Sequence, residues 1–515
     1  MADPQNRLDE SGQHFDLCVI GGGINGVGIA RDAAGRGLSV LLIEKDDLAQ
    51  GTSSRSGKLV HGGLRYLEYY EFRLVRDALV EREVLLESAP HIIWPMRFVL
   101  PHSPDDRPAW LIRLGLFLYD HLGGRKKLPG TRVLDLHKDP EGHAIKDHYQ
   151  RAFEYSDCWV DDARLVVLNA VDAVERGASL LTRTQCTHAQ RENGQWSVRL
   201  ETGHNREPLM IRAAGLVNAA GPWVDNVIDG IAGVDARRRI RLVKGSHIIV
   251  KKFWEGDQAY LVQNSDKRVI FINPYERGRA LIGTTDIPYK GDPADVYVEQ
   301  SEVDYLIAVV NRYFKVQLSL DDVIHKYSGV RPLFDDNADN PSAVTRDYLF
   351  DLDVADTNTP LLSVYGGKLT TYRKLAEQAV DKLSEYYSLN TGAWTAKASL
   401  PGGDIPDADY ESFARSLGVK FSQLPENLLS HYGRLYGTRT LDLLTDVETL
   451  EQLGQHFGHL LYEVEVRYLV RHEWACTAND ILQRRTKHGL HLSSDQRLIF
   501  EEWFSCQYVT LMQER

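Results

Sequence analysis

The chain has few cysteines and no long apolar run. Its 515 residues include five scattered cysteines, with no C-x-x-C pair and no cysteine–histidine cluster of zinc-binding spacing. This set indicates reduced thiols in a cytosol-facing protein, and Cys18, inside an apolar strand pattern, is expected to be buried. No stretch of about 18 uncharged apolar residues occurs, so no transmembrane helix is predicted. Residues 1–14 are polar, lack the apolar core of a signal peptide, and are expected to form a disordered extension.

An excess of positive charge is also missing. The formal net charge is −12, which argues against a broad basic surface for nucleic acid, although a small basic pocket is still compatible with it. Hydrophobic residues make up 43% and charged residues 26%, as in ordinary globular proteins. The length predicts two or three domains.

One apolar segment has two possible locations in the folded protein. Residues 108–127, PAWLIRLGLFLYDHLGGRKK, carry Arg113 within the apolar run and end in a basic cluster. Such a segment either lies in a membrane interface or forms a buried helix with a polar exit. The sequence leaves both interpretations open.

A glycine-rich turn follows the first predicted strand. Residues 15–47, FDLCVIGGGINGVGIARDAAGRGLSVLLIEKDD, read as strand, turn, helix and strand, with the spacing Gly21-x-Gly23-x-x-Gly26. The glycines let the backbone approach a pyrophosphate, and the helix N-terminus adds N–H groups and partial positive charge. Glu44, at the end of the second strand, suits ribose hydroxyls and argues against an NADP 2′-phosphate. The sequence therefore predicts a dinucleotide site, without separating NAD from FAD at this point.

The segments that come later favour FAD. The second strand runs into DDLAQGTSSRSGKLVHGGLRYLE, and two further small-residue turns occur, NAAGPW at 218–223 and GGKLTTYRK at 366–374. Several distant segments closing on one extended cofactor fit FAD better than NAD. The predicted cofactor-binding residues are Gly21, Gly23, Ile24, Asn25, Gly26, Glu44, Thr52, Ser53, Ser54, Lys58, Leu59, Ala219, Gly221, Trp223, Gly367, Lys368, Leu369 and Thr370.

Periodicity predicts several other elements. Helices are expected over 71–89 and 301–314, the second with an acidic first turn. Residues 360–387 read as a strand, a Gly-Gly turn and a long helix. Residues 391–406 are rich in turn formers and look like a linker, and the rest of the chain shows helical patterns.

The motifs together resemble one flavoprotein family. VIGGGINGVGIARDAAGRGLSVLLIE, TSSRSGKLVHGGLRYLEYYEFRLV, YSDCWVDDARLV, NAAGPWVD, KGSHIIV, IGTTDIPYKGDP, YSGVRPL, TRDY and GGKLTTYRKLAE occur in this order, and YLVRHEWACTANDILQRRTK follows near the C-terminus. The chain resembles the FAD-dependent glycerol-3-phosphate dehydrogenases of the aerobic, bacterial homodimeric type. One departure is Gly57, where relatives often carry serine or threonine, and altered hydrogen bonding is expected there without loss of the site.

The resemblance implies an activity and a location. The family oxidises sn-glycerol 3-phosphate at C2 to dihydroxyacetone phosphate, with hydride transfer to FAD and electrons passed to a membrane quinone. Its members lie on the cytoplasmic face of the inner membrane, so a peripheral homodimer in contact with an anionic or inner-membrane lipid surface is expected. Two alternatives stay open, an amino-acid or amine oxidase of the same fold and a non-catalytic flavin-binding regulatory protein.

The resemblance also implies an α/β fold of mixed α+β character. Its parts are an FAD-binding Rossmann-like domain of the glutathione-reductase/amino-acid-oxidase type, a β-sheet substrate domain and a C-terminal helical cap. The expected boundaries are 15–90, 155–225 and 345–390 for the FAD-binding domain, 91–154 and 226–344 for the substrate domain, 391–406 for the linker, and 407–515 for the cap.

Binding of a phosphorylated substrate needs fixed positive charge despite the acidic average. Arginine binds two phosphate oxygens with its planar fork, whereas lysine acts as a point charge. The resemblance places Arg65, Arg331 and Lys368 at the substrate, and Arg346 is expected in the same cluster. Tyr66 and Thr370 are predicted to hydrogen-bond the phosphate or the flavin.

Removal of the C2 hydroxyl proton needs a base. His61, four residues before Arg65, is the first candidate, His247 is the second, and Arg331 can polarise the hydroxyl as ketone character develops. No metal site is expected, because His456 and His459 have i, i+3 spacing but no evident third ligand.

A run of carboxylates is expected to be structural. Asp157, Asp161 and Asp162 lie within YSDCWVDDARL and are expected to cap a helix that begins near Ala163.

Overall fold

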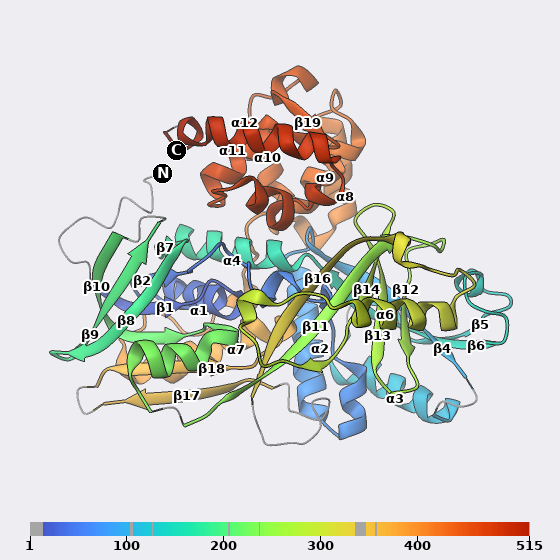
Figure 1. The fold of residues 1–515 in the computed structure, drawn as a ribbon, viewed down its shortest axis with the longest axis horizontal. Helices are drawn as coiled ribbons and strands as arrows, with labels where there is room; N and C mark the ends of the chain where they lie inside the picture. Colours follow the sequence, from blue (N-terminus) through green and yellow to red (C-terminus); the bar gives the residue numbers. More distant parts are fainter. Residues whose placement is uncertain are drawn as a thin grey trace.

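The computed structural model describes residues 14–103, 107–125, 127–203, 207–235, 237–334, 347–355 and 358–513. They form two large β-sheets side by side, with a helical layer across both (Figure 1). This arrangement confirms the predicted mixed α/β fold. Residues 1–13 of the expected N-terminal extension lie outside the described residues, whereas His14 already pairs with Arg212 in the first sheet.

The first sheet has a parallel centre, in the order β18-β10-β1-β2-β7, flanked by antiparallel strands. Its strands are β1 (His14–Ile20), β2 (Val40–Ile43), β7 (Ser179–Leu181), β8 (Thr184–Glu192), β9 (Gln195–Thr202), β10 (Glu207–Asn218), β17 (Leu349–Val354) and β18 (Pro360–Tyr365). Helices α1 (Ile24–Gly35), α4 (Asp162–Glu175) and α7 (Tyr372–Leu383) cover one face. Strands covered on both faces read as continuous apolar runs, which explains why β1 and β2 show no polar alternation.

The hydrophobic core shows that the first sheet is covered on both faces. Leu17 and Val19 of β1 pack towards the three helices, whereas Cys18 and Ile20 point to the opposite face and pack near Trp196 of β9. Cys18 is fully buried, as predicted.

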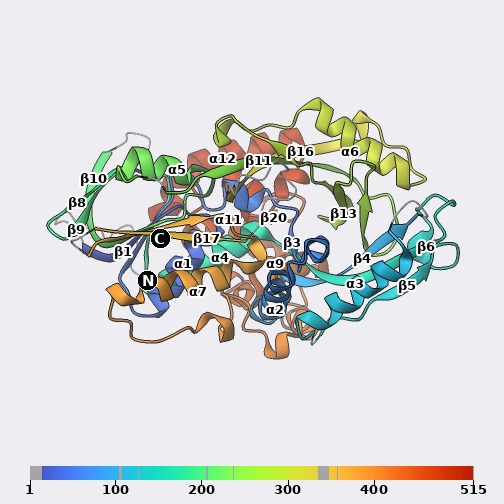
Figure 2. The ribbon, with the colours of Figure 1, turned by 90° about the horizontal axis from the view of Figure 1, so that it is seen from below.

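The second sheet has the order β15-β11-β14-β13-β12-β4-β6-β3, with β16 on β11 and β5 on β6 (Figure 2). Its strands are β3 (Leu59–Val60), β4 (Ile93–His102), β5 (Arg132–Asp135), β6 (Arg151–Val160), β11 (Ile240–Lys251), β12 (Ala259–Gln263), β13 (Val269–Tyr275), β14 (Arg279–Gly283), β15 (Ile287–Pro288) and β16 (Val323–Phe334). Helix α6 (Gln300–Tyr313) covers one face, and α2 (Phe72–Ser88) and α3 (Ala109–Leu122) cover the other.

Two details differ from expectation. The boundary expected at 154/155 cuts through β6, which pairs with β4 along its whole length, so residues 155–160 lie in the second sheet. Helix α6 begins one residue earlier than predicted, because Glu299 is the cap and forms a reciprocal capping box with Glu302.

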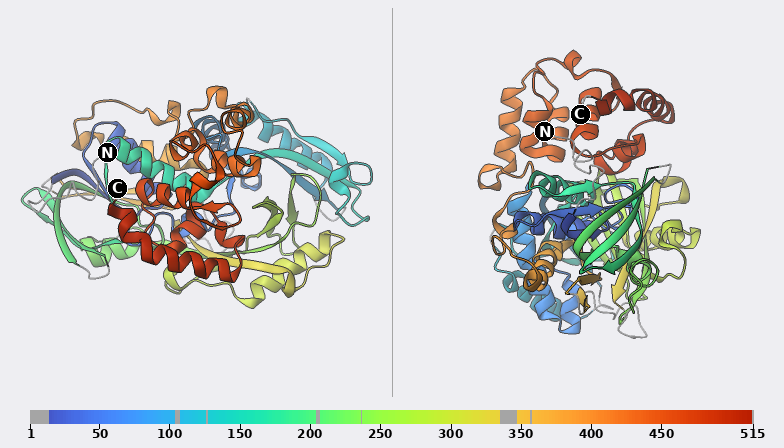
Figure 3. Two further views of the ribbon diagram at one scale, coloured as in Figure 1. Left: turned by 90° about the horizontal axis from the view of Figure 1, so that it is seen from above. Right: turned by 90° about the vertical axis from the view of Figure 1, so that its left-hand side faces the viewer.

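The C-terminal part forms the helical layer over the sheets (Figure 3). Its helices are α8 (Tyr410–Lys420), α9 (Glu426–Tyr436), α10 (Thr440–Leu443), α11 (Glu463–His472) and α12 (Ser494–Gln513). The predicted all-helical pattern is wrong over 456–462, where β19 (His456–Gly458) and β20 (Leu461–Tyr462) form a small antiparallel pair. In the part of the chain that the structure describes, no helix is long and apolar enough to cross a bilayer.

Buried ion pairs join this layer to the rest of the molecule. Lys487 pairs with Asp161 at the start of α4, and Arg485 contacts Asp47 at 2.7 Å. Each carboxylate is buried and lies in a different region from its partner. Removing one partner of such a pair leaves an uncompensated buried charge, so the layer is docked specifically.

Candidate functional site

A cavity of about 630 Å³ runs from the glycine-rich turn of the first sheet to strands β11, β14 and β16 of the second. Its size lies within the range of about 300–1,000 Å³ that is usual for small-molecule and cofactor sites. The cavity is bounded by segments that lie far apart in the sequence, including residues 20–25, 43–61, 219–227 and 366–370.

The glycine-rich turn brings backbone close to backbone. Gly21 has φ +113°, and a Cβ atom there would lie 2.6 Å from the carbonyl oxygen of Ala219. A Cβ atom on Gly26 would lie 1.8 Å from the carbonyl oxygen of Gly21. Only glycine fits at either position, and the first turn of α1 is thereby pressed against the end of β1. The N-terminus of α1 therefore lies at the cavity, where a helix N-terminus favours an anion.

Two side chains fix this turn. The hydroxyl of Ser53 accepts a hydrogen bond from the Ile24 N–H at 3.0 Å, and Glu44 accepts from the Gly22 N–H at 2.7 Å and the Asp46 N–H at 2.8 Å. Desolvation in the cavity wall raises the pKa of Glu44 to about 7. Glu44 keeps lone pairs for two further donors, as a ribose diol requires.

The other end of the cavity carries cationic side chains. Arg331 on β16 donates to Asp286 and, at 3.1 Å, to the hydroxyl of Thr284. Its side chain is 25% exposed, so it is partly desolvated but open to the cavity. Lys368 lies on the turn after β18, with its ammonium 3.7 Å from the centre of the Tyr66 ring. Arginine held by a neighbouring carboxylate and lysine over an aromatic face are both positioned cations.

Two histidines line the same end. His61 packs edge-to-face on Phe271, and its backbone exchanges hydrogen bonds with the Thr370 hydroxyl at 3.2 and 3.3 Å. His247 on β11 stacks on Tyr327, and its Nδ1 atom is buried without a hydrogen-bond partner among the described residues.

The charge state of His247 follows from its surroundings. Burial, reinforced by the positive charge of Arg331 and Lys58, lowers the pKa of His247 well below its usual value. The ring is therefore neutral near pH 7.

Most of the predicted residues lie around the cavity. Those in its lining are Gly21, Gly23, Ile24, Asn25, Glu44, Thr52, Ser53, Leu59, His61, Tyr66, Ala219, Gly221, Trp223, His247, Arg331, Gly367, Lys368, Leu369 and Thr370. Gly26 lies behind this lining, where it allows the close approach of α1 to the turn.

The remaining predicted residues do not line it. Lys58 and Ser54 face a second cavity of about 450 Å³, and Lys58 is buried against Asp162 at 2.9 Å. The ammonium of Lys58 pairs with a carboxylate of α4, so its contact with the flavin stays a prediction. Arg65 is also outside the lining, so its place at the substrate stays a prediction. Arg346 lies outside the described residues.

The three aspartates of YSDCWVDDARL have different partners and different roles. Asp161 caps α4 by accepting from the Arg164 N–H at 3.1 Å, which confirms the predicted cap. Asp157 does not cap this helix, because it lies in β6 and pairs with Arg82 at 2.9 Å. Asp162 holds Lys58.

Sequence reasoning missed several residues of the site. Asp286 and Thr284 belong to the quoted segment IGTTDIPYKGDP, but only the fold shows that they clamp Arg331. Phe271 packs on His61 from β13, where it reads as an ordinary strand residue. Gly57 lies in the lining, and a Cβ atom there would be 3.7 Å from His247 Nε2, so a small side chain would fit.

The residues present fit FAD. The glycine-rich turn places the N-terminus of α1 at the cavity for a pyrophosphate, Glu44 can accept from a ribose, and the cavity extends from there to the far sheet. Asn25 Oδ1 is buried and accepts no hydrogen bond from the described residues, so it is available to a ligand donor. These observations indicate that this chain can hold an elongated dinucleotide.

Comparison with known proteins agrees with this geometry. Residues 16–356 match the family described as FAD dependent oxidoreductase, and residues 393–498 match the C-terminal domain of alpha-glycerophosphate oxidase.

Two curated relatives are similar over nearly their whole length. The D-erythritol 1-phosphate dehydrogenase of Brucella abortus is 65% identical over 95% of this chain and 97% of that protein. The aerobic glycerol-3-phosphate dehydrogenase of Escherichia coli is 54% identical over 95% and 97%. Among solved structures, the glycerol-3-phosphate dehydrogenase from Bacillus halodurans complexed with FAD has a TM-score of 0.73 and 26% identity, covering 98% of this chain and 96% of that one.

Proposed function

Because the chain belongs to the family of FAD-dependent oxidoreductases, we propose that it oxidises sn-glycerol 3-phosphate at C2 to dihydroxyacetone phosphate. When bound, FAD supplies the acceptor for the hydride that leaves C2. The side chains of this chain bind the phosphate, orient the C2 carbon and take the hydroxyl proton.

The observation that carries this proposal is the pair of cations, Arg331 and Lys368, in the cavity that begins at the glycine-rich turn. A phosphate dianion needs such fixed positive charge in a partly desolvated place. An amino-acid substrate of a related oxidase needs one arginine for its carboxylate and a largely apolar remainder. The two cations with Tyr66 and Thr370 beside them therefore favour a phosphorylated substrate.

His247 is the base that the geometry supports best. Its ring is neutral near pH 7, and its Nδ1 atom has no partner among the described residues. Arg331 lies in the same part of the cavity and stabilises the negative charge that develops on the C2 oxygen. His61 is the second candidate, and Thr370 holds its backbone in place. His247→Gln should abolish the acidic limb of the pH–rate profile, where protonation of the base lowers the rate, whereas His61→Gln should keep it.

A second candidate substrate is D-erythritol 1-phosphate, because the relative that acts on it shares 65% identity with this chain. Both substrates present a secondary alcohol next to a CH₂–O–phosphate group. The same cations and the same base therefore serve both, and discrimination depends on the space beyond the reacting carbon.

One experiment separates these alternatives. The purified, FAD-loaded protein is mixed anaerobically with sn-glycerol 3-phosphate, with D-erythritol 1-phosphate and with glycine, and the visible band of oxidised flavin is followed. Bleaching by glycerol 3-phosphate supports the proposal, and much faster bleaching by erythritol 1-phosphate assigns that substrate instead. Bleaching by glycine alone indicates the amino-acid oxidase, and a flavin that no substrate bleaches indicates the regulatory alternative.

Membrane contact through α3 is part of the proposal. Trp110, Leu114 and Phe117 are 67%, 48% and 57% exposed, whereas Leu116 and Tyr119 on its other face are buried. A helix with an exposed aromatic face beside basic residues can lie in a lipid interface. Flotation of Trp110→Asp with anionic vesicles should fall well below that of the native protein.

A matched control is available for this test. Val419, on α8, is an exposed apolar residue away from α3, and Val419→Asp should float like the native protein. Equal flotation of the Trp110 variant and the native protein would contradict a role for α3.

The remaining parts of the proposal are the electron acceptor and the assembly. We infer transfer of electrons to a membrane quinone, a position on the cytoplasmic face of the inner membrane, and a homodimer, all from the family resemblance. Reduction of a short-chain quinone with glycerol 3-phosphate, and light scattering of the detergent-solubilised protein, test the acceptor and the dimer. Reduction of NAD instead, or a monomer under all conditions, would contradict them.

A further inference from the structure

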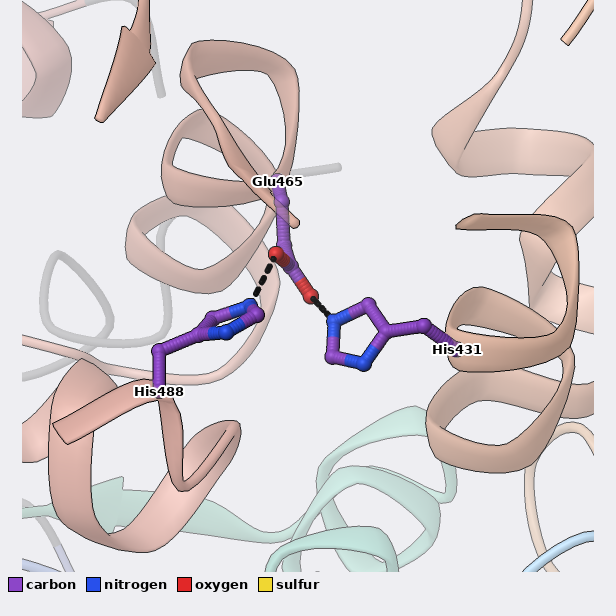
Figure 4. Close-up of side chains that lie close together, drawn as sticks. All are labelled: His431, Glu465 and His488. Atoms are coloured by element: carbon purple, nitrogen blue, oxygen red, sulfur yellow. Dashed lines mark hydrogen bonds and ion pairs between the residues drawn. The ribbon is translucent and has the colours of Figure 1, made fainter. Parts of the chain in front are cut away.

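Three donor side chains meet inside the C-terminal layer, and none of them is part of the lining of either cavity (Figure 4). His431 comes from α9, Glu465 from α11, and His488 from the short helix His488–Leu490. His431 Nε2 lies 2.9 Å from Glu465 Oε1, and His488 Nε2 lies 3.2 Å from Glu465 Oε2. One ligand atom from each residue lies within 4.8 Å of the other two.

We propose that His431, Glu465 and His488 bind one divalent transition-metal ion of the zinc class. Two imidazoles and one carboxylate form a ligand set that zinc uses in proteins. The same set is poorly suited to magnesium or calcium, which prefer all-oxygen ligands. The site joins three segments separated in sequence, as structural metal sites do.

The separations agree with such an ion. Bonds of about 2.0–2.1 Å at tetrahedral angles place two ligand atoms about 3.4 Å apart. The two nitrogen–oxygen contacts, 2.9 and 3.2 Å, are slightly shorter than this separation, and the upper limit of 4.8 Å between any two of the three ligand atoms is longer. Small side-chain rotations therefore suffice to place all three donors around one ion.

The three donors are buried. The side chains of Glu465 and His488 are 0% and 1% exposed, and that of His431 is 10% exposed.

A second layer of groups orients the donors. His488 Nδ1 lies 3.4 Å from His459 Nδ1, and the Tyr436 hydroxyl donates to Glu465 at 2.8 Å. Metal-bound histidines usually donate their other ring N–H to such a partner. His456, which has the spacing of a ligand partner in the sequence, instead contacts the backbone oxygen of His459.

The place of the site predicts what the ion does. His488 directly follows Lys487, whose ammonium pairs with Asp161 of the first sheet's α4, and Arg485 pairs with Asp47 nearby. The ion would fix the segment through which the C-terminal layer docks. None of the three donors lines the flavin cavity, so the ion stabilises the docked layer and takes no part in the oxidation.

A shared proton is the competing occupant, since the same atoms also make ordinary hydrogen bonds. The test uses the FAD-loaded full chain, first treated with a chelator and then supplied with Zn²⁺ or Co²⁺. We expect one tightly bound ion per chain by elemental analysis, a Co²⁺ visible spectrum of tetrahedral type, and a raised melting temperature. A chain that binds no stoichiometric ion and melts identically with and without Zn²⁺ would overturn the proposal.

Substitution of the donor histidines tests where the ion binds. His431→Gln and His488→Gln should each weaken Zn²⁺ binding by at least about 100-fold, since even loss of outer-layer partners weakens metal affinity 10–100-fold. His137→Gln is the control, because His137 is an exposed histidine bonded to a backbone oxygen. Unchanged Zn²⁺ affinity in the two variants would place any bound ion elsewhere and overturn the assignment. If either variant fails to fold, the Co²⁺ spectrum of the native chain still decides the matter.

Discussion

The arrangement of Arg331 and Asp286 gives a quantitative prediction. Arg331 meets the substrate only if its guanidinium is held at the cavity, and Asp286 and Thr284 hold it there. Arg331→Ala removes a charge-assisted contact worth about 1.5–3 kcal/mol. At about 1.36 kcal/mol per factor of ten, kcat/KM for glycerol 3-phosphate should fall roughly 10- to 150-fold.

Asp286 is predicted to act through Arg331. Asp286→Asn should lower kcat/KM in the native background, because the arginine loses its charged partner and samples other positions. In the Arg331→Ala background the same change should have little further effect. Such non-additivity is the signature of two residues that work through one contact.

The assay is steady-state oxidation of glycerol 3-phosphate with an artificial acceptor, together with the flavin content of each variant. Arg268→Ala is the matched control, because Arg268 is 27% exposed, pairs with Asp266, and lies outside the cavity lining. Full flavin content with kcat/KM of Arg331→Ala close to the native value would refute this placement. Additive effects of Arg331→Ala and Asp286→Asn would refute the coupling.

Three further predictions concern pH and stability. Since Glu44 titrates near pH 7 without ligand, FAD affinity should weaken as pH falls below about 7, and Glu44→Gln should remove this dependence in a fluorescence titration. Lys58→Ala should lower the free energy of unfolding, measured in urea, by about 3–5 kcal/mol, because it leaves the carboxylate of Asp162 buried without its partner. The double change Lys58→Met with Asp162→Asn should recover most of the lost stability. Altered FAD affinity at unchanged stability would contradict the pairing. Burial lowers the pKa of His91 in the folded protein to about 3, below its value in the unfolded chain. The free energy of unfolding should therefore fall as pH drops from about 6.5, by up to about 1.36 kcal/mol per pH unit. His91→Phe should flatten this slope in acid unfolding curves.

Local patterns predicted a large part of the fold. The strand, glycine turn and helix around Gly21 were predictable because the glycine spacing and the flanking apolar runs lie within one short stretch. Helix α2 was predictable from its periodicity, and it spans Phe72–Ser88 within the expected 71–89. The pair β19 and β20 was not, because HFGHLLY has an apolar pattern that also suits a helix and only packing against α12 separates the two.

The sequence by itself determined the type of cofactor turn and the kinds of side chain available for the chemistry. Only the tertiary structure decided their partners. Lys58 lies in a serine-rich segment that predicts a flavin contact, but its ammonium pairs with Asp162, which is 104 residues away. The clamp on Arg331 comes from the connection between β14 and β15. The physical reason is that backbone conformation depends mainly on neighbouring residues, whereas the energy of a buried charge depends on which opposite charge the fold places beside it.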